Sequence, residues 1–250
     1  MAALLSSKPK DPACLRTVGR VLTTLVSSQL QLIRFVKSPH LSTYLNLVST
    51  TLRTDMDVNC IKSLVRPLRR VLTRMESFEA LASSSVLTTC AAIDATSPYF
   101  VTVMKTLFFL AYNSQGINIL LSKNLLSPAL LSVIQKKDEL SSTEKRAVCQ
   151  LAHHHTGSTI LSDSGYLSNL LDWLKETVSS DSGIDLEDAA LTDRVDFLGS
   201  VLSSVYCIRK VQGKFDWVVN RLILRRRCND DAVLCEEDSC EVQSILSRFC

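Results

Sequence analysis

Glycine and proline are scarce in this chain of 250 residues, with seven and six copies, and aromatic residues make up only 6%. No segment alternates apolar and polar residues for the length of a strand, so few strands are expected. The most apolar stretch, residues 100–113, is shorter than the ~20 residues that span a bilayer and contains Lys105. The amino terminus lacks the basic region and apolar core of a secretory signal. We therefore expect no membrane association.

Signatures of catalysis are missing as well. The sequence contains no glycine-rich phosphate loop, no G-x-S-x-G elbow and no H-E-x-x-H helix. The formal net charge is only +3, and the basic clusters at 66–70 and 225–227 have no interleaved aromatic residues for stacking on bases. We therefore expect no enzyme, no cofactor, no small-molecule substrate and no nucleic-acid partner.

The cysteines do not form a disulfide framework. There are nine, an odd number, and five lie within apolar helix-like runs: Cys14, Cys60, Cys90, Cys149 and Cys207. A free thiol in such a run behaves as a small apolar residue. This pattern fits a reducing compartment, so we predict a cytoplasmic protein, with the nucleus as the alternative.

What the chain does contain is a recurring unit. Five times, an apolar helix-like run is followed by a polar break and a second run that opens on a leucine or an aromatic residue. These anchors lie 46, 39, 41 and 48 residues apart, and they are Leu41, Leu87, Leu126, Leu167 and Phe215. A period near ~40 residues is typical of stacked helical units that cannot bury their apolar faces alone.

Single residues predict interruptions within these units. Pro67 lies inside the apolar run 57–73, where its missing N–H is expected to kink the helix near residues 63–66. In the third unit we expect Gly116 to turn the chain, because glycine takes a positive φ without penalty. Gly157 is expected to occupy a turn of the fourth unit.

A unit with a first helix, a short middle helix and a long closing helix resembles the armadillo repeat. Residues 107–131, with their AYNSQG turn, carry this resemblance best, and it covers residues 13–224. It implies an all-α, armadillo/HEAT-like superhelical solenoid of about five irregular helical repeats.

Two finer comparisons follow from this resemblance. Importin-like armadillo proteins clamp an extended peptide with a ladder of asparagines, but Asn46, Asn113 and Asn169 occupy unrelated positions in their units. Nuclear-import peptide binding is therefore not implied. Two short segments, 13–16 and 110–113, are similar to the armadillo amino-terminal region of the cancerous inhibitor of protein phosphatase 2A.

The repeats are expected to occupy residues 11–226, interrupted by an acidic loop at 177–188. Residues 227–250 depart from the pattern and are expected to form an acidic, cysteine-containing tail or cap. In the loop, Ser182 precedes acidic residues at 185, 187 and 188, which acidophilic kinases favour, so Ser182 is a candidate phosphosite. A phosphate there would add about −2 charge and extend the loop or dock it on a basic patch.

Two groups of residues were considered as metal ligands. Cys149 and His153 share one helix face, but no second ligand pair is fixed beside them. The other group consists of the tail cysteines Cys228, Cys235, Cys240 and Cys250. Their spacing lacks the paired close steps of a zinc site. We predict no metal site, and a metal-dependent regulatory protein is kept as an alternative.

Together these observations predict a non-enzymatic scaffold or adaptor that binds a protein or peptide partner on the solenoid surface. The candidate contacts are polar residues of the closing helices: Asn46, Arg53, Ser132, Lys136, Asn169, Asp172, Lys175 and Asn220, with Ser49, Thr88 and Thr89 beside them. Tyr44 and Trp173 are either aromatic anchors for the partner or core residues. A module that self-associates through residues 217–224, giving a homodimer, is the other alternative.

Overall fold

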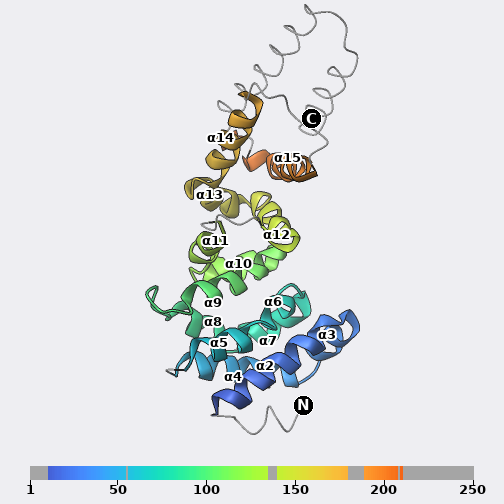
Figure 1. Cartoon of the computed structure of the whole chain (residues 1–250), viewed down its shortest axis with the longest axis vertical. Helices are drawn as coiled ribbons and strands as arrows, with labels where there is room; N and C mark the ends of the chain where they lie inside the picture. The colour runs from blue at the N-terminus through green and yellow to red at the C-terminus, as the bar shows by residue number, and fades with distance from the viewer. Residues whose placement is uncertain (1–10, 55, 135–139, 180–188, 208, 211–250) are drawn as a thin grey trace, which may run out of the picture. The chain divides into compact units, whose positions relative to one another are not determined.

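All the regular structure in the described residues is helical, and these residues contain no strand (Figure 1). The computed structural model describes residues 11–54, 56–134, 140–179, 189–207 and 209–210. The chain divides into two compact parts, an amino-terminal part (1–147) and a carboxy-terminal part (148–250). The prediction of an all-α fold is confirmed.

The helices follow the predicted order of first, middle and closing helix. Repeat 1 consists of α2 (Pro12–Ser27), α3 (Gln29–Val36) and α4 (His40–Leu52). Repeat 2 consists of α5 (Val58–Val65), α6 (Leu68–Val71), the 3₁₀ turn η1 (Met75–Ser77), α7 (Phe78–Ser83) and α8 (Val86–Ala91). Repeat 3 consists of α9 (Phe100–Leu107), η2 (Phe108–Tyr112), α10 (Ser114–Ser122) and α11 (Leu126–Ile134).

The pattern continues with α12 (Ser142–Ala152), α13 (His155–Asp163) and α14 (Tyr166–Ser179) in repeat 4, and α15 (Ala189–Leu202) opens repeat 5. The fifth anchor, Phe215, lies outside the described residues, as do residues 217–224 and the tail. The number of repeats and the domain limits at 11–226 stay predictions.

Local chemistry explains where these helices begin and break. The carboxylate of Asp11 accepts a hydrogen bond from the N–H of Cys14 at 2.9 Å and so caps α2, and Pro12 occupies the first turn, where its missing N–H costs nothing. Pro67 separates α5 from α6, and α5 ends at Val65. The predicted interruption near residues 63–66 is confirmed.

The first helices of repeats 1 and 2 approach so closely that only glycine fits between them. α2 and α5 pack directly against each other, and a Cβ atom on Gly19 would overlap the main-chain carbonyl of Ser63. Residues of any other type would therefore force the two helices apart. Sequence inspection alone did not assign Gly19 this role.

Gly116 has the same kind of role within repeat 3. The prediction that it takes a positive φ in a turn is wrong, because Gly116 is the third residue of α10 and the described glycine with a positive φ is Gly165. A Cβ on Gly116 would overlap the carbonyl of Leu110 in η2. Gly157 is likewise the third residue of α13, in place of the expected turn.

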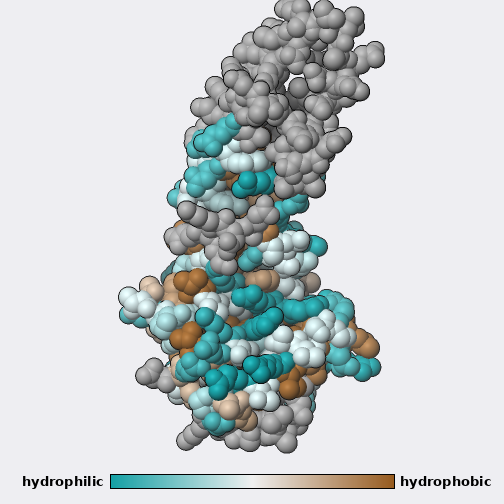
Figure 2. All heavy atoms as spheres, in the orientation of Figure 1, coloured by the Kyte–Doolittle hydropathy of each residue, from teal (hydrophilic) through white to brown (hydrophobic). Residues whose placement is uncertain are grey.

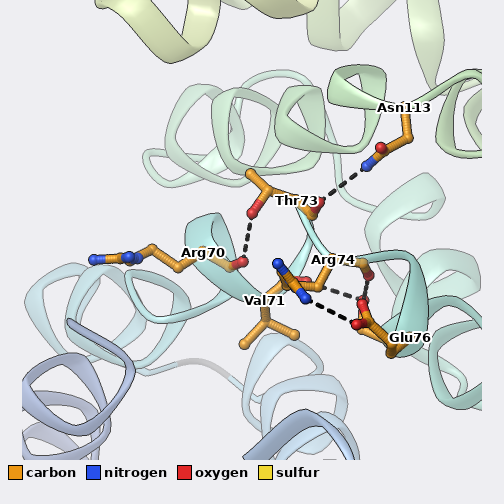
Figure 3. Close-up of polar contacts among 7 residues, drawn as sticks. Arg70, Val71, Thr73, Arg74, Glu76 and Asn113 are labelled. Carbon is orange, nitrogen blue, oxygen red and sulfur yellow. Dashed lines mark hydrogen bonds and ion pairs between the residues drawn. The ribbon is translucent and has the colours of Figure 1, made fainter. Parts of the chain in front are cut away.

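Side chains also tie one repeat to the next at the ends of the first helices. The guanidinium of Arg70 donates to the carbonyl oxygen of Ser27 at 2.7 Å. The amide of Asn113 donates to the carbonyl oxygen of Thr73 at 3.0 Å, as Figure 3 shows. Carbonyls at a helix end have no partner within the helix. The partly buried bond from Asn113 therefore satisfies a carbonyl where two repeats meet, and the exposed bond from Arg70 links two repeats at the surface.

A side-chain hydrogen bond to a carbonyl at a helix end also occurs in the carboxy-terminal part. The hydroxyl of Ser204, which follows α15, donates to the carbonyl oxygen of Ala152 at the end of α12, at 2.6 Å. Ser204 is 1% exposed, so its hydroxyl cannot bond to water and makes this hydrogen bond within the protein. The same type of contact thus recurs between repeats 1 and 2, 2 and 3, and 4 and 5.

Tyr44 proves to be a core residue. Its ring is fully buried in α4, and its hydroxyl donates to the carbonyl oxygen of Leu64 at 2.7 Å. Burial raises the pKa of the Tyr44 hydroxyl well above its ordinary value. Of the two roles considered for Tyr44, the anchor for a partner is therefore excluded.

No single described helix has both the length and the apolar character of a membrane span. The pair α10 and α11 passes that test jointly, with a bend of 113° between the two helices. Both helices place apolar residues in the buried core, including Ile117, Leu120 and Leu130.

We predict that Gly19→Ala lowers the free energy of unfolding. Overlap with the carbonyl of Ser63 costs about 1–3 kcal/mol, and the better helix propensity of alanine returns at most about 1 kcal/mol. Urea denaturation followed by circular dichroism measures the difference. Thr17→Ala, at an exposed position of the same helix, is the matched control and should be neutral. Equal stability of the two variants would contradict the close α2–α5 contact.

Candidate functional site

A hollow of about 480 Å³ lies at the carboxy-terminal ends of the closing helices α4 and α8. The two helices pack side by side. The polar residues that line the hollow are Arg53, Thr88, Thr89, Asp94, Ser97 and Tyr99. It is the part of the predicted contact surface where the structure brings several of the candidate residues together.

The hollow exists because α8 is short. It has six residues where α4 has thirteen, and the chain leaves it in a tight turn. One carboxylate oxygen of Asp94 accepts from both the N–H of Thr96 (2.8 Å) and the hydroxyl of Thr96 (2.7 Å). These bonds lower the pKa of Asp94. The hydroxyl of Tyr99 donates to the carbonyl of Leu52 at 3.4 Å, which ties the returning segment to α4.

Hydroxyl groups join the two closing helices beneath the hollow. Ser49 of α4 is 2% exposed, and its oxygen lies 2.8 Å from the hydroxyl of Thr89 and 2.7 Å from that of Ser85. The hydroxyl of Thr89 also lies 2.8 Å from the carbonyl oxygen of Ser85. Because a buried network of this kind is fully paired, it fixes the positions of its members.

Arg53 is held at one end of this network. Its Nε donates to the hydroxyl of Thr89 at 3.2 Å, while the side chain stays exposed. Among the described residues, no carboxylate forms an ion pair with Arg53. The terminal amino groups of its guanidinium therefore retain their hydrogen-bonding capacity at the hollow.

The segment of the chain that contains the hollow is rich in basic residues. Residues 11–134 contain twelve lysines and arginines against six aspartates and glutamates. The closing helices α4, α8 and α11 contain no acidic residue. Asp94 supplies a carboxylate to the lining, and it is already engaged with Thr96.

The predicted contact residues divide between the two parts. In the amino-terminal part, Arg53, Thr88 and Thr89 line the hollow, Ser49 lies beneath it, and Asn46 is exposed on α4. In the carboxy-terminal part, α14 exposes Asn169 and Asp172. Trp173, the second aromatic candidate, is partly exposed there, and the guanidinium carbon of Arg194 lies 4.7 Å from the centre of its ring.

Ser132 is not a surface residue, contrary to its expected role. It is 7% exposed on α11, and its hydroxyl donates to the carbonyl oxygen of Ala129 at 2.7 Å. The phase of α11 turns this position toward the core. Lys136, Asn220 and Ser182 lie outside the described residues, as does the side chain of Lys175.

Sequence reasoning missed half of the polar lining. Asp94, Ser97 and Tyr99 belong to the segment after α8, which was not assigned to the surface. A signal for it was present, because an aspartate two residues before Thr96 and four before Pro98 is typical of a turn. That turn predicts a shortened closing helix.

The three consecutive histidines have structural roles. His154 caps α13, where its Nδ1 accepts from the N–H of Gly157 at 3.3 Å. His155 packs edge-on against Tyr206 at 5.4 Å, and Nε2 of His153 lies 3.5 Å from the hydroxyl of Ser203. In the described part of the chain, no three His, Cys, Asp or Glu side chains gather as a metal-binding group. The tail cysteines lie outside it.

The cysteines within the helices behave as apolar residues. Cys60, Cys90 and Cys207 are buried with free thiols, and Cys14 and Cys149 are partly buried. Burial raises the pKa of Cys90 to about 12 and that of Cys149 to about 11. The thiols of Cys90 and Cys149 are therefore protonated at neutral pH and are poor nucleophiles.

We predict that Cys90 resists alkylation in the folded protein. With a pKa raised to about 12, its thiolate is a negligible fraction at pH 8, and the thiol is 1% exposed. Iodoacetamide labelling followed by peptide mass spectrometry should show Cys90 unmodified in buffer and fully modified in urea. Rapid labelling of Cys90 in buffer would contradict its burial.

Comparison with known proteins identifies the architecture. No protein-family model and no curated protein matches the sequence. Among solved structures, the chain is similar to a designed armadillo repeat protein at 17% identity, with a TM-score of 0.62 and 99% of each chain covered. It is also similar to a designed armadillo repeat protein in complex with the peptide (KR)4, at 18% identity and a TM-score of 0.61, covering 99% of this chain and 98% of that one.

A third similar structure shows computationally designed armadillo repeat proteins for modular peptide recognition. Its identity to this chain is 17% and its TM-score is 0.59, and the match covers 99% of this chain and 98% of that chain. At such identities the likeness concerns the fold. It confirms the resemblance drawn from the helical pattern. The chain has the armadillo-type repeat fold, an all-α solenoid.

Proposed function

We propose that this protein is a non-enzymatic scaffold that binds an extended segment of a protein partner on its closing helices. The observation that carries the proposal is the hollow between α4 and α8, with Arg53 fixed at its edge by the hydroxyl of Thr89. Two of the similar structures support it, because one is a complex with the peptide (KR)4 and the other is of armadillo repeat proteins designed for modular peptide recognition. Stacked helical repeats commonly serve as extended binding surfaces.

The chemistry of the hollow suits a peptide. An extended chain carries N–H and C=O groups that need partners once water is displaced. Hydroxyl groups both donate and accept, and the exposed Thr88 and the partly exposed Ser97 and Tyr99 offer them along the hollow. Asn46 adds an exposed amide on α4. Thr88 and Asn46 are mounted on the packed helices α8 and α4, so these two side chains lose little conformational entropy on binding.

Regulation through the acidic loop at 177–188 is a finer part of the proposal. Ser182 precedes acidic residues at 185, 187 and 188, the environment of an acidophilic kinase site. A phosphate would increase the negative charge of the loop. The buried free thiols of Cys60, Cys90 and Cys207 suit a reducing compartment, so we place this activity in the cytoplasm.

Peptide selection tests the proposed function. A displayed library of random twelve-residue peptides is panned against the purified full chain, and the affinity of enriched peptides is measured for two variants. Thr88→Trp fills the hollow and should weaken binding about tenfold or more, since it blocks the central contact. Ser83→Trp, at an exposed position of α7, is the matched control and should bind normally. Failure to enrich any peptide, or unchanged binding by Thr88→Trp, would contradict the proposal.

A further inference from the structure

We propose that the hollow selects an acidic peptide segment, with a Glu or Asp carboxylate of the partner held by the guanidinium of Arg53. This inference rests on the peptide-binding function above and specifies the chemistry of the ligand. Neither the repeat pattern nor the similar structures assign a preference of this kind, and the peptide named in one of them, (KR)4, is basic.

The first argument is the geometry of Arg53. Its Nε is used by the hydroxyl of Thr89, which is itself fixed by Ser49 and Ser85. A guanidinium tethered through Nε keeps its two terminal amino groups side by side, the arrangement that forms paired hydrogen bonds with a carboxylate. Because the network orients the side chain before the ligand arrives, less side-chain entropy is lost on binding.

The second argument concerns the counter-charge of Arg53. No described carboxylate forms an ion pair with Arg53, in contrast to Arg74, which pairs with Glu76 at 2.8 Å (Figure 3). Asp94, on the lining, directs one oxygen at the N–H and hydroxyl of Thr96 and keeps a lowered pKa. Arg53 is therefore available to bind an anionic group of the ligand. Asp94 would repel an acidic side chain of the ligand that lay next to it.

The third argument is the excess of basic residues in the amino-terminal part. Six lysines and arginines lie on the first helices of repeats 1 and 2, on the break between α5 and α6, and on α6: Arg16, Arg20, Lys62, Arg66, Arg69 and Arg70, of which Arg16 pairs with Asp57 at 3.5 Å. In Figure 2, hydrophilic side chains form broad bands over this part of the molecule. A positive surface of this kind attracts acidic segments and raises their association rate, more strongly at low salt. The same field opposes a basic peptide.

The test uses three fluorescein-labelled peptides of twelve residues, built from Gly and Ser, with three Glu, three Lys or three phosphoserines at the same positions. Anisotropy titrations are made with the full chain at low and at physiological salt. The Glu peptide is expected to bind about tenfold tighter than the Lys peptide, with the difference reduced by salt. Tighter binding of the Lys peptide, or no detectable binding of the Glu peptide, overturns the proposal.

Single substitutions test whether the preference for the Glu peptide depends on Arg53. Arg53→Gln should weaken binding of the Glu peptide about tenfold, the effect of losing one charge-assisted pair of hydrogen bonds. Arg53→Lys should weaken it less, because lysine keeps the positive charge but lacks the two adjacent amino groups of a guanidinium. Arg34→Gln, at an exposed position of α3 away from the lining, is the control for general charge and should change affinity less than about twofold. Equal losses for Arg53→Gln and Arg34→Gln would refute the assigned site.

Two further outcomes separate this inference from the function on which it rests. A phosphoserine peptide that binds more than tenfold tighter than the Glu peptide, and depends on Arg53, would make the ligand a phosphopeptide and overturn the acidic-peptide assignment. Library peptides that depend on Thr88 but show no acidic preference would leave peptide binding intact and overturn only this inference.

Discussion

The close approach of the first helices of repeats 1 and 2 is the constraint on which the amino-terminal part depends. α2 and α5 can meet at that distance only because position 19 has no side chain to collide with the main chain at Ser63. Stacking at this distance buries apolar faces that each repeat alone would expose. At the ends of helices, Arg70 and Asn113 donate hydrogen bonds that join one repeat to the next.

The proposed binding surface is a consequence of this stacking and lies on the closing helices. Repeats held in register place α4 beside α8, where buried hydroxyls of Ser49 and Thr89 meet. The early end of α8, caused by the Asp94 turn, then leaves a hollow in place of another turn of helix. Arg53 reaches this hollow with its position already fixed. The same packing that stabilises the repeats thus prepares a cationic site.

Much of this was predictable, because the helical period and the leucine anchors depend on the chain itself. Pro67 predicted its helix break for the same reason. The roles of residues that contact a neighbouring helix or repeat were harder to predict from the sequence. Gly116 was assigned to a turn because its contact with Leu110 depends on how two helices pack, and Ser132 was assigned to the surface because the phase of a nine-residue helix is easily misjudged. Arg53 was predicted as a contact residue and is exposed at the end of α4, but its hydrogen bond to Thr89 could be found only from the structure.

Hydrogen exchange on a Gly19→Val variant tests the central claim most directly, since the larger side chain disrupts one contact between neighbours. If each repeat is stabilised chiefly by the next, amide exchange will accelerate in α2 and α5, less in α9, and hardly at all in α13 and α14. A uniform acceleration over all described helices, or none in α5, would contradict the account.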